Sequence, residues 1–133
     1  MTGAIIVGTL LRASAAMVAA VPIERIKLGL LPDGVPLPAV VIRTISSVDR
    51  QPLKRGASVR VTDRVSVTVR AASYRDQTAI IELIRTACAG RIGDVGGGRR
   101  VSILTAGTGP DLAGPANSFE QSQDFRVSFD ADA

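Results

Sequence analysis

Residues 58–72 read SVRVTDRVSVTVRAA and alternate apolar with polar side chains almost without interruption. Because successive side chains of a β-strand point to opposite faces, this alternation predicts one long strand with a buried apolar face and a solvent-exposed polar face. Asp63 is the single polar residue on the apolar side. The strand is much longer than the usual length of about 5–6 residues, so we expect a bend or bulge near Asp63.

The residues that follow this strand have the pattern of an amphipathic helix. Ser73 with Asp76 three positions later approximates a capping box, with Asp in place of Glu or Gln. Gly90 is a suitable residue to end the helix. The apolar stripe between these two ends, at helical spacing, consists of Ile80, Ile81, Ile84, Ala87 and Cys88.

Three further segments have strand patterns. Residues 39–45 are rich in β-branched side chains, and residues 99–105 and 125–129 alternate apolar with polar side chains. A short edge strand is also expected within residues 23–28. The polar or glycine-rich and proline-rich segments 46–57 and 106–118 are expected to be flexible connections.

The N-terminal segment 3–20 has apolar residues at helical spacing, and Ser14 is a potential break and N-cap. Arg12 interrupts its apolar run and no basic region precedes it, which argues against a signal peptide or a membrane span. We therefore expect a core helix of a cytoplasmic protein. Together the segments predict a single α+β domain over residues 1–133, with a mainly antiparallel sheet and two helices packed on one face.

Composition excludes several kinds of chemistry. The chain has no His, so nucleophile pairs that use His and zinc sites that contain His are excluded. Its single Cys88 lies in an apolar stretch and is expected to pack as a small hydrophobe. We expect no catalytic residue, no cofactor and no metal site. An enzyme is the least favoured class.

The formal net charge is +4, which is compatible with an acidic partner. The charge is spread along the chain, so a solvated or subunit-contacting surface is favoured over a phosphate-binding track. A small basic nucleic-acid-binding module remains the alternative, because several arginines share one face of the long strand. The candidate subunit-interface residues are Lys54, Arg55, Arg60, Arg64 and Arg70.

Two other motifs are interpreted as structural. The glycine-rich segment 93–98 lacks the Gly-Lys-Ser/Thr ending of a phosphate-binding loop, and a strand pattern follows it instead of a helix. It therefore predicts a flexible turn between helix and strand. The carboxylates Asp124, Asp130 and Asp132 lie on a strand face and in the C-terminal tail, where we expect them to be solvated.

The order of three motifs resembles the phage tail terminator or tail completion family, which also occurs in prophages and gene transfer agents. A proline-rich LPDGVPLP at 31–38 leads into an apolar strand, and the long strand runs through AASY at 71–74 into the amphipathic helix. The third motif, DFRVSF at 124–129, closes the chain. The similarity covers roughly Leu10–Phe129, and the sequence departs from the family in its glycine-rich turns at 93–98 and 106–117.

The resemblance implies a structural subunit that forms a hexameric ring at the head-proximal end of a tail tube. Such a ring ends tube polymerisation and joins the tail to the head or neck. The implied partners are further copies of the chain, the tail tube protein and a head–tail connector or neck protein, with DNA passing through the lumen without specific binding. The implied location is a virion or phage-like particle, assembled in the bacterial cytoplasm and without contact to a membrane.

Overall fold

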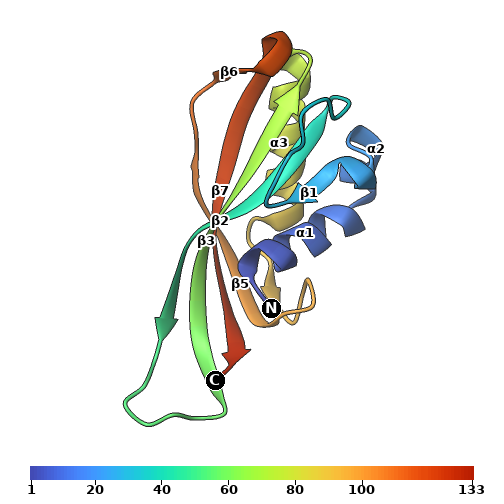
Figure 1. Ribbon diagram of the computed structural model, residues 1–133. Helices are drawn as coiled ribbons and strands as arrows, with labels where there is room; N and C mark the ends of the chain where they lie inside the picture. Colours follow the sequence, from blue (N-terminus) through green and yellow to red (C-terminus); the bar gives the residue numbers. More distant parts are fainter.

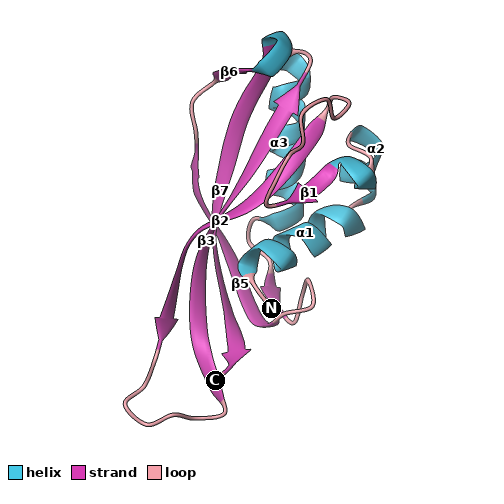
Figure 2. Ribbon diagram, viewed as in Figure 1, coloured by secondary structure: helices cyan, strands magenta, loops and turns pink.

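The chain forms one mixed sheet with helices against one of its faces (Figures 1 and 2). The structure is a computed structural model that describes residues 1–133. The expected α+β class and mainly antiparallel sheet are confirmed. In chain order the elements are α1 (Gly3–Ala13), α2 (Ala15–Ala20), η1 (Ile23–Arg25), β1 (Ile26–Leu28), β2 (Ala39–Arg50), β3 (Ser58–Ala71), α3 (Tyr74–Cys88), β4 (Ile92–Gly93), β5 (Arg99–Thr108), β6 (Leu112–Gly114), η2 (Pro115–Asn117) and β7 (Ser118–Asp132).

The sheet has the strand order β1-β2-β3-β7-β5-β4, and β6 pairs with the first residues of β7. Only β1 and β2 are parallel, and all other neighbours are antiparallel. The edge strand expected within 23–28 is confirmed for its second half, while residues 23–25 form a short 3₁₀ turn. Pairing with β1 ends at Leu28↔Ile42, so one edge of β2 has no neighbouring strand beyond this point.

The predicted long strand is β3, and it lies in the middle of the sheet. All of its residues pair with β7 in one unbroken register, from Ser58↔Asp132 to Ala71↔Phe119. The bulge expected in β3 near Asp63 is instead in β2, where Ile45 is inserted between the pairs Thr44↔Val65 and Ser46↔Arg64. A bulge can lie in either strand of a pair, so the alternation of β3 alone could not locate it.

Asp63 anchors the first helix to the sheet. Its Oδ2 accepts a hydrogen bond from the backbone N–H of Gly3 at 2.8 Å, and only 3% of the residue is exposed. The first N–H groups of a helix have no partner within the helix and carry partial positive charge, which a carboxylate satisfies. A Cβ at position 3 would lie 2.9 Å from the Asp63 Cβ, so the close approach requires glycine.

The helices begin where the sequence predicts. The hydroxyl of Ser73 accepts from the Asp76 N–H at 3.1 Å, and that of Ser14 accepts from the Met17 N–H at 3.3 Å. The apolar face of β3 packs with α1 and α3 into one core (Figure 1). None of the helices is both long enough and apolar enough to cross a membrane.

Two of the expected connections are wrong in part. The segment 46–57 begins with five residues of β2, and the segment 106–118 contains the end of β5, all of β6 and the first residue of β7. The terminal strand expected at 125–129 begins seven residues earlier, at Ser118. Residues 120–124 of β7 are polar on both faces, so no apolar alternation marks them. Gln121 and Gln123 face α3, and Ser122 and Asp124 lie on the opposite face.

The two faces of β3 give a direct test of the register. Val67 is fully buried, whereas Thr68 lies on the opposite face, where its hydroxyl bonds to that of Ser122. We expect Val67→Asp to lower the free energy of unfolding by roughly 3–5 kcal/mol, because it buries an unpaired charge. Thr68→Asp should cost no more than about 1 kcal/mol beside the arginines of its face. Urea denaturation measures both values, and equal losses would contradict the register.

Candidate assembly surfaces

The uncovered face of the sheet carries a ladder of ion pairs between β3 and β7. Arg60 pairs with Asp130 at 3.1 Å, Arg64 with Asp124 at 2.9 Å, and Arg70 with Glu120 at 2.7 Å. The first and third pairs join residues directly opposite each other, and the second joins diagonal neighbours. Such cross-strand pairs of opposite charge stabilise a sheet and fix its register.

Hydroxyl pairs occupy positions between these ion pairs. Thr62 bonds to Ser128 at 2.9 Å, and Thr68 bonds to Ser122 at 2.8 Å. Along β3 the polar face is therefore tied to β7 by side chains as well as by the backbone. The expectation that Asp124 and Asp130 are merely solvated is wrong, because arginines on the neighbouring strands engage both of them.

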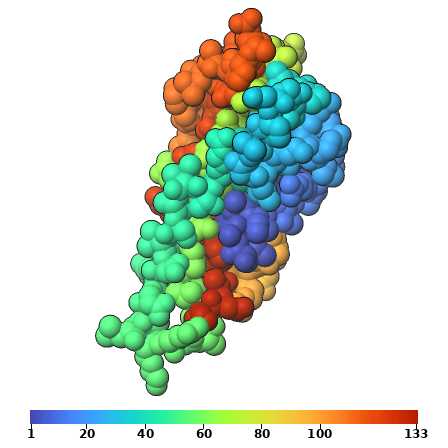
Figure 3. All heavy atoms as spheres, viewed as in Figure 1, coloured from blue at the N-terminus to red at the C-terminus, as the bar shows by residue number.

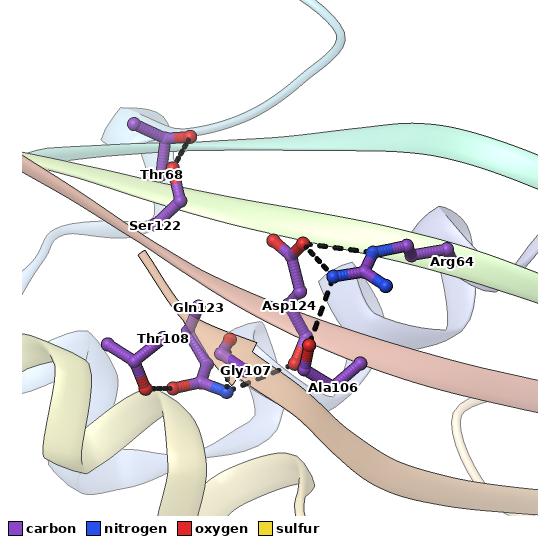
Figure 4. A network of polar contacts seen from close by, with 8 residues as sticks. All are labelled: Arg64, Thr68, Ala106, Gly107, Thr108, Ser122, Gln123 and Asp124. Atoms are coloured by element: carbon purple, nitrogen blue, oxygen red, sulfur yellow. Dashed lines mark hydrogen bonds and ion pairs between the residues drawn. The ribbon is translucent and has the colours of Figure 1, made fainter. Parts of the chain in front are cut away.

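A bulge in β5 is held from both sides of the sheet (Figure 4). Ala106 and Gly107 face the single residue Asp124, and Gly107 adopts the positive φ of +112°. Arg64 donates to the Ala106 carbonyl at 3.0 Å from one face, and Gln123 donates to the Gly107 carbonyl at 3.1 Å from the other. The carbonyls at this irregularity thus find side-chain partners, as backbone groups in a folded protein require.

A polar cluster that the sequence analysis missed lies between α3 and the sheet. Gln77 donates to Gln121 at 3.2 Å and to Asp111 at 3.0 Å, and Arg85 donates to Gln123 at 3.1 Å. The Gln77 and Gln123 side chains are fully buried. Glutamine is usually exposed, so polarity at these positions concealed their place in the core.

The candidate interface residues divide into two groups. Arg60, Arg64 and Arg70 are engaged in the ladder, while Lys54 and Arg55 lie in the loop between β2 and β3. That loop is the end of an arm, defined here as residues 46–60, which projects beyond the helices (Figures 1 and 3). Whether these five residues contact a neighbouring subunit stays a prediction.

The geometry offers little for chemistry. No three His, Cys, Asp or Glu side chains lie close enough together to hold a metal ion. Burial raises the pKa of the Cys88 thiol to about 12, against a weaker opposing effect of the nearby Arg91 charge. A thiol reacts as the thiolate, so Cys88 is inert near neutral pH.

A small α+β protein with a braced sheet, an uncovered polar face and a projecting arm has the architecture of an assembly subunit. The chain matches the family model described as "Tail completion protein gp17" over residues 7–129. It belongs to this family, so the resemblance of the sequence to tail completion proteins is confirmed. The protein is therefore a structural component of a phage-type tail particle, not an enzyme.

The fold is shared with a chain of the solved structure described as "Virion of native gene transfer agent (GTA) particle". The two chains superpose with a TM-score of 0.68 at 16% identity, over 94% of this chain and 92% of the other. The superposition shows that the two chains share a fold. No curated protein matches the chain.

The bulge network predicts a local effect of Arg64. Arg64→Ala removes the donor to the Ala106 carbonyl together with the pair to Asp124, so we expect a loss of about 1 kcal/mol in the free energy of unfolding. Hydrogen exchange at residues 105–108 should accelerate in the same variant. Arg126→Ala is the matched control, because Arg126 is exposed on the same face and forms no ion pair. Faster exchange in both variants or in neither would contradict the bracing role.

Proposed function

We propose that the protein forms a closed ring of six copies at the head-proximal end of the tail tube, where it ends tube polymerisation and joins the tail to the head or neck. Membership of the tail completion family supports a role at this position. The number six follows the resemblance of the sequence to tail terminators. The main structural support for a ring is the arm, because it exposes an edge of β2 that pairs with no strand of the same subunit.

The free edge belongs to β2. Residues 43–50 are all exposed, and two large apolar side chains stand among them, Ile45 at 57% and Val48 at 63% exposure. An uncovered strand edge with apolar side chains readily pairs with another chain. A ring in which each copy covers the edge of its neighbour uses different patches on the two partners, and closure leaves no patch free.

Within this proposal the basic residues have two tasks. Lys54 and Arg55, at the end of the arm, contact the neighbouring subunit. Arg60, Arg64 and Arg70 hold β3 against β7, which keeps the arm straight enough to reach that neighbour. One rim of the ring binds the tail tube protein, and the other binds the connector or neck protein.

The ring predicts a discrete assembly. Native mass spectrometry of the purified protein should find a species six times the mass of the 13.8 kDa chain, with a population that rises with concentration. Ile45→Asp together with Val48→Asp should shift the population to monomer, because charge on a buried apolar contact opposes association. A wild-type protein that remains monomeric at every concentration, and that leaves growing tail tubes unrestricted in length, would contradict the proposed function.

The lumen is proposed to let DNA pass without specific binding. Carboxylates neutralise the arginines of the ladder, and binding to duplex DNA depends on cations that are free to replace counterions at phosphates. We expect affinity in the range of about 10⁻⁴–10⁻⁶ M at physiological salt, as for non-specific binding. Gel-shift titration measures it. Nanomolar saturable binding that Arg60→Glu abolishes, at unchanged oligomeric state, would favour the nucleic-acid-binding module instead.

A further inference from the structure

The end of the arm presents an apolar side chain flanked by positive charge. Leu53 is fully exposed and lies in the loop between β2 and β3, next to Lys54 and Arg55. Lys54 has no ion pair, and Arg55 donates only to the carbonyl of Ala133. The hairpin formed by β2 and β3 projects from the body of the subunit (Figure 3), so the rest of the subunit does not cover Leu53 at its end.

An apolar hollow of about 460 Å³ lies beside β6 and the start of α3. These elements are at the end of the sheet opposite the arm (Figure 1). Tyr74, Leu112 and Phe119 supply its largest side chains, and all three are exposed. The rings of Tyr74 and Phe119 meet edge to face, with their centroids 6.4 Å apart. Asp111 is the only charged residue of the lining.

The backbone around this hollow is held in an unusual conformation. Ala116 and Asn117 both have positive φ, at 55° and 60°, although neither is glycine. The hydroxyl of Ser118, which also lines the hollow, is buried and has no hydrogen-bond partner in the subunit. Consecutive strained residues beside an unsatisfied polar group are a pattern found where a protein is shaped for binding.

The hollow and the arm end match in both apolarity and charge. Leu53 offers the side chain that an apolar hollow accepts, and Lys54 and Arg55 offer charge opposite to Asp111. A second apolar hollow, beside α1 and β2, has Arg43 as its charged residue and would repel the arm end. The hollow near the end of β7 is lined by Arg99, Asp130 and Asp132 and is mainly polar.

These matching surfaces cannot meet within one copy. They lie at opposite ends of β3, whose fourteen residues span roughly 45 Å at about 3.3 Å per residue. We propose that the arm of one copy inserts Leu53 into the hollow lined by Tyr74, Leu112 and Phe119 of the next copy, with Lys54 and Arg55 facing Asp111. This contact rests on the proposed ring and specifies which surfaces of neighbouring copies meet in it.

Thiol cross-linking tests the contact. One preparation carries Leu53→Cys and a second carries Leu112→Cys, and they are mixed at high concentration with a short bis-maleimide. The native Cys88 is buried and unreactive, so it does not interfere. Leu53→Cys mixed with Ile92→Cys is the matched control, because Ile92 is highly exposed and lies outside the hollow.

We expect a cross-linked dimer with the Leu112→Cys partner well above the yield with the Ile92→Cys partner. Asp111→Arg in the acceptor should lower the yield roughly fivefold, in line with the loss of ion pairs at the rim of a contact. Combining it with Lys54→Asp and Arg55→Asp in the donor should restore the yield. A yield no higher than that of the control overturns the inference.

Native mass measurement on the same samples separates this inference from the proposed ring. A six-copy wild-type assembly without the 53–112 product contradicts the arm-to-hollow contact and leaves the ring standing. A chain carrying both substitutions that cross-links into ladders longer than six copies confirms the contact and contradicts the closed ring. A cross-linked series that ends at six copies supports both.

Discussion

β3 pairs with β7 over its whole length, and its two faces meet different partners. The apolar residues of β3 complete the core with α1 and α3, while its arginines and threonines meet carboxylates and hydroxyls of β7. A shift of one residue would exchange the two faces and put arginines beneath the helices. The apolar and ionic requirements therefore fix the same register, and each reinforces the other.

This pairing has a mechanical consequence for assembly. The helices cover only part of the sheet, yet β3 and β7 remain paired from Ser58, in the arm, to Ala71, beside the start of α3. The continuous pairing of β3 with β7 therefore holds the end of the arm and the hollow at a fixed separation. Because a subunit with its contact surfaces at fixed separation and orientation can close a ring of defined size, the long strand links the fold to the proposed function.

The sequence predicted the elements that apolar periodicity and helix caps define. It did not predict side-chain contacts between residues that are far apart in the chain. The alternation of β3, the stripe of α3 and the caps at Ser14 and Ser73 predicted those elements correctly. The family resemblance indicated tail completion, which the family match confirms. By contrast, Asp63 broke the apolar pattern because its partner is the N-terminus of α1, sixty residues earlier in the chain. The carboxylates of β7 likewise acquire their role only when β3 supplies the facing arginines.

In the proposed assembly, the arm of each copy contacts the opposite end of the next copy, and the copies form a closed ring above the tail tube. An electron cryo-microscopy reconstruction of the tail–head junction of the assembled particle would show this arrangement. We expect one ring of six copies, with residues 51–57 of each copy in contact with residues 111–119 of the next. Copies whose arms point away from their neighbours, or a junction that holds the chain in any arrangement other than a closed ring, would contradict it.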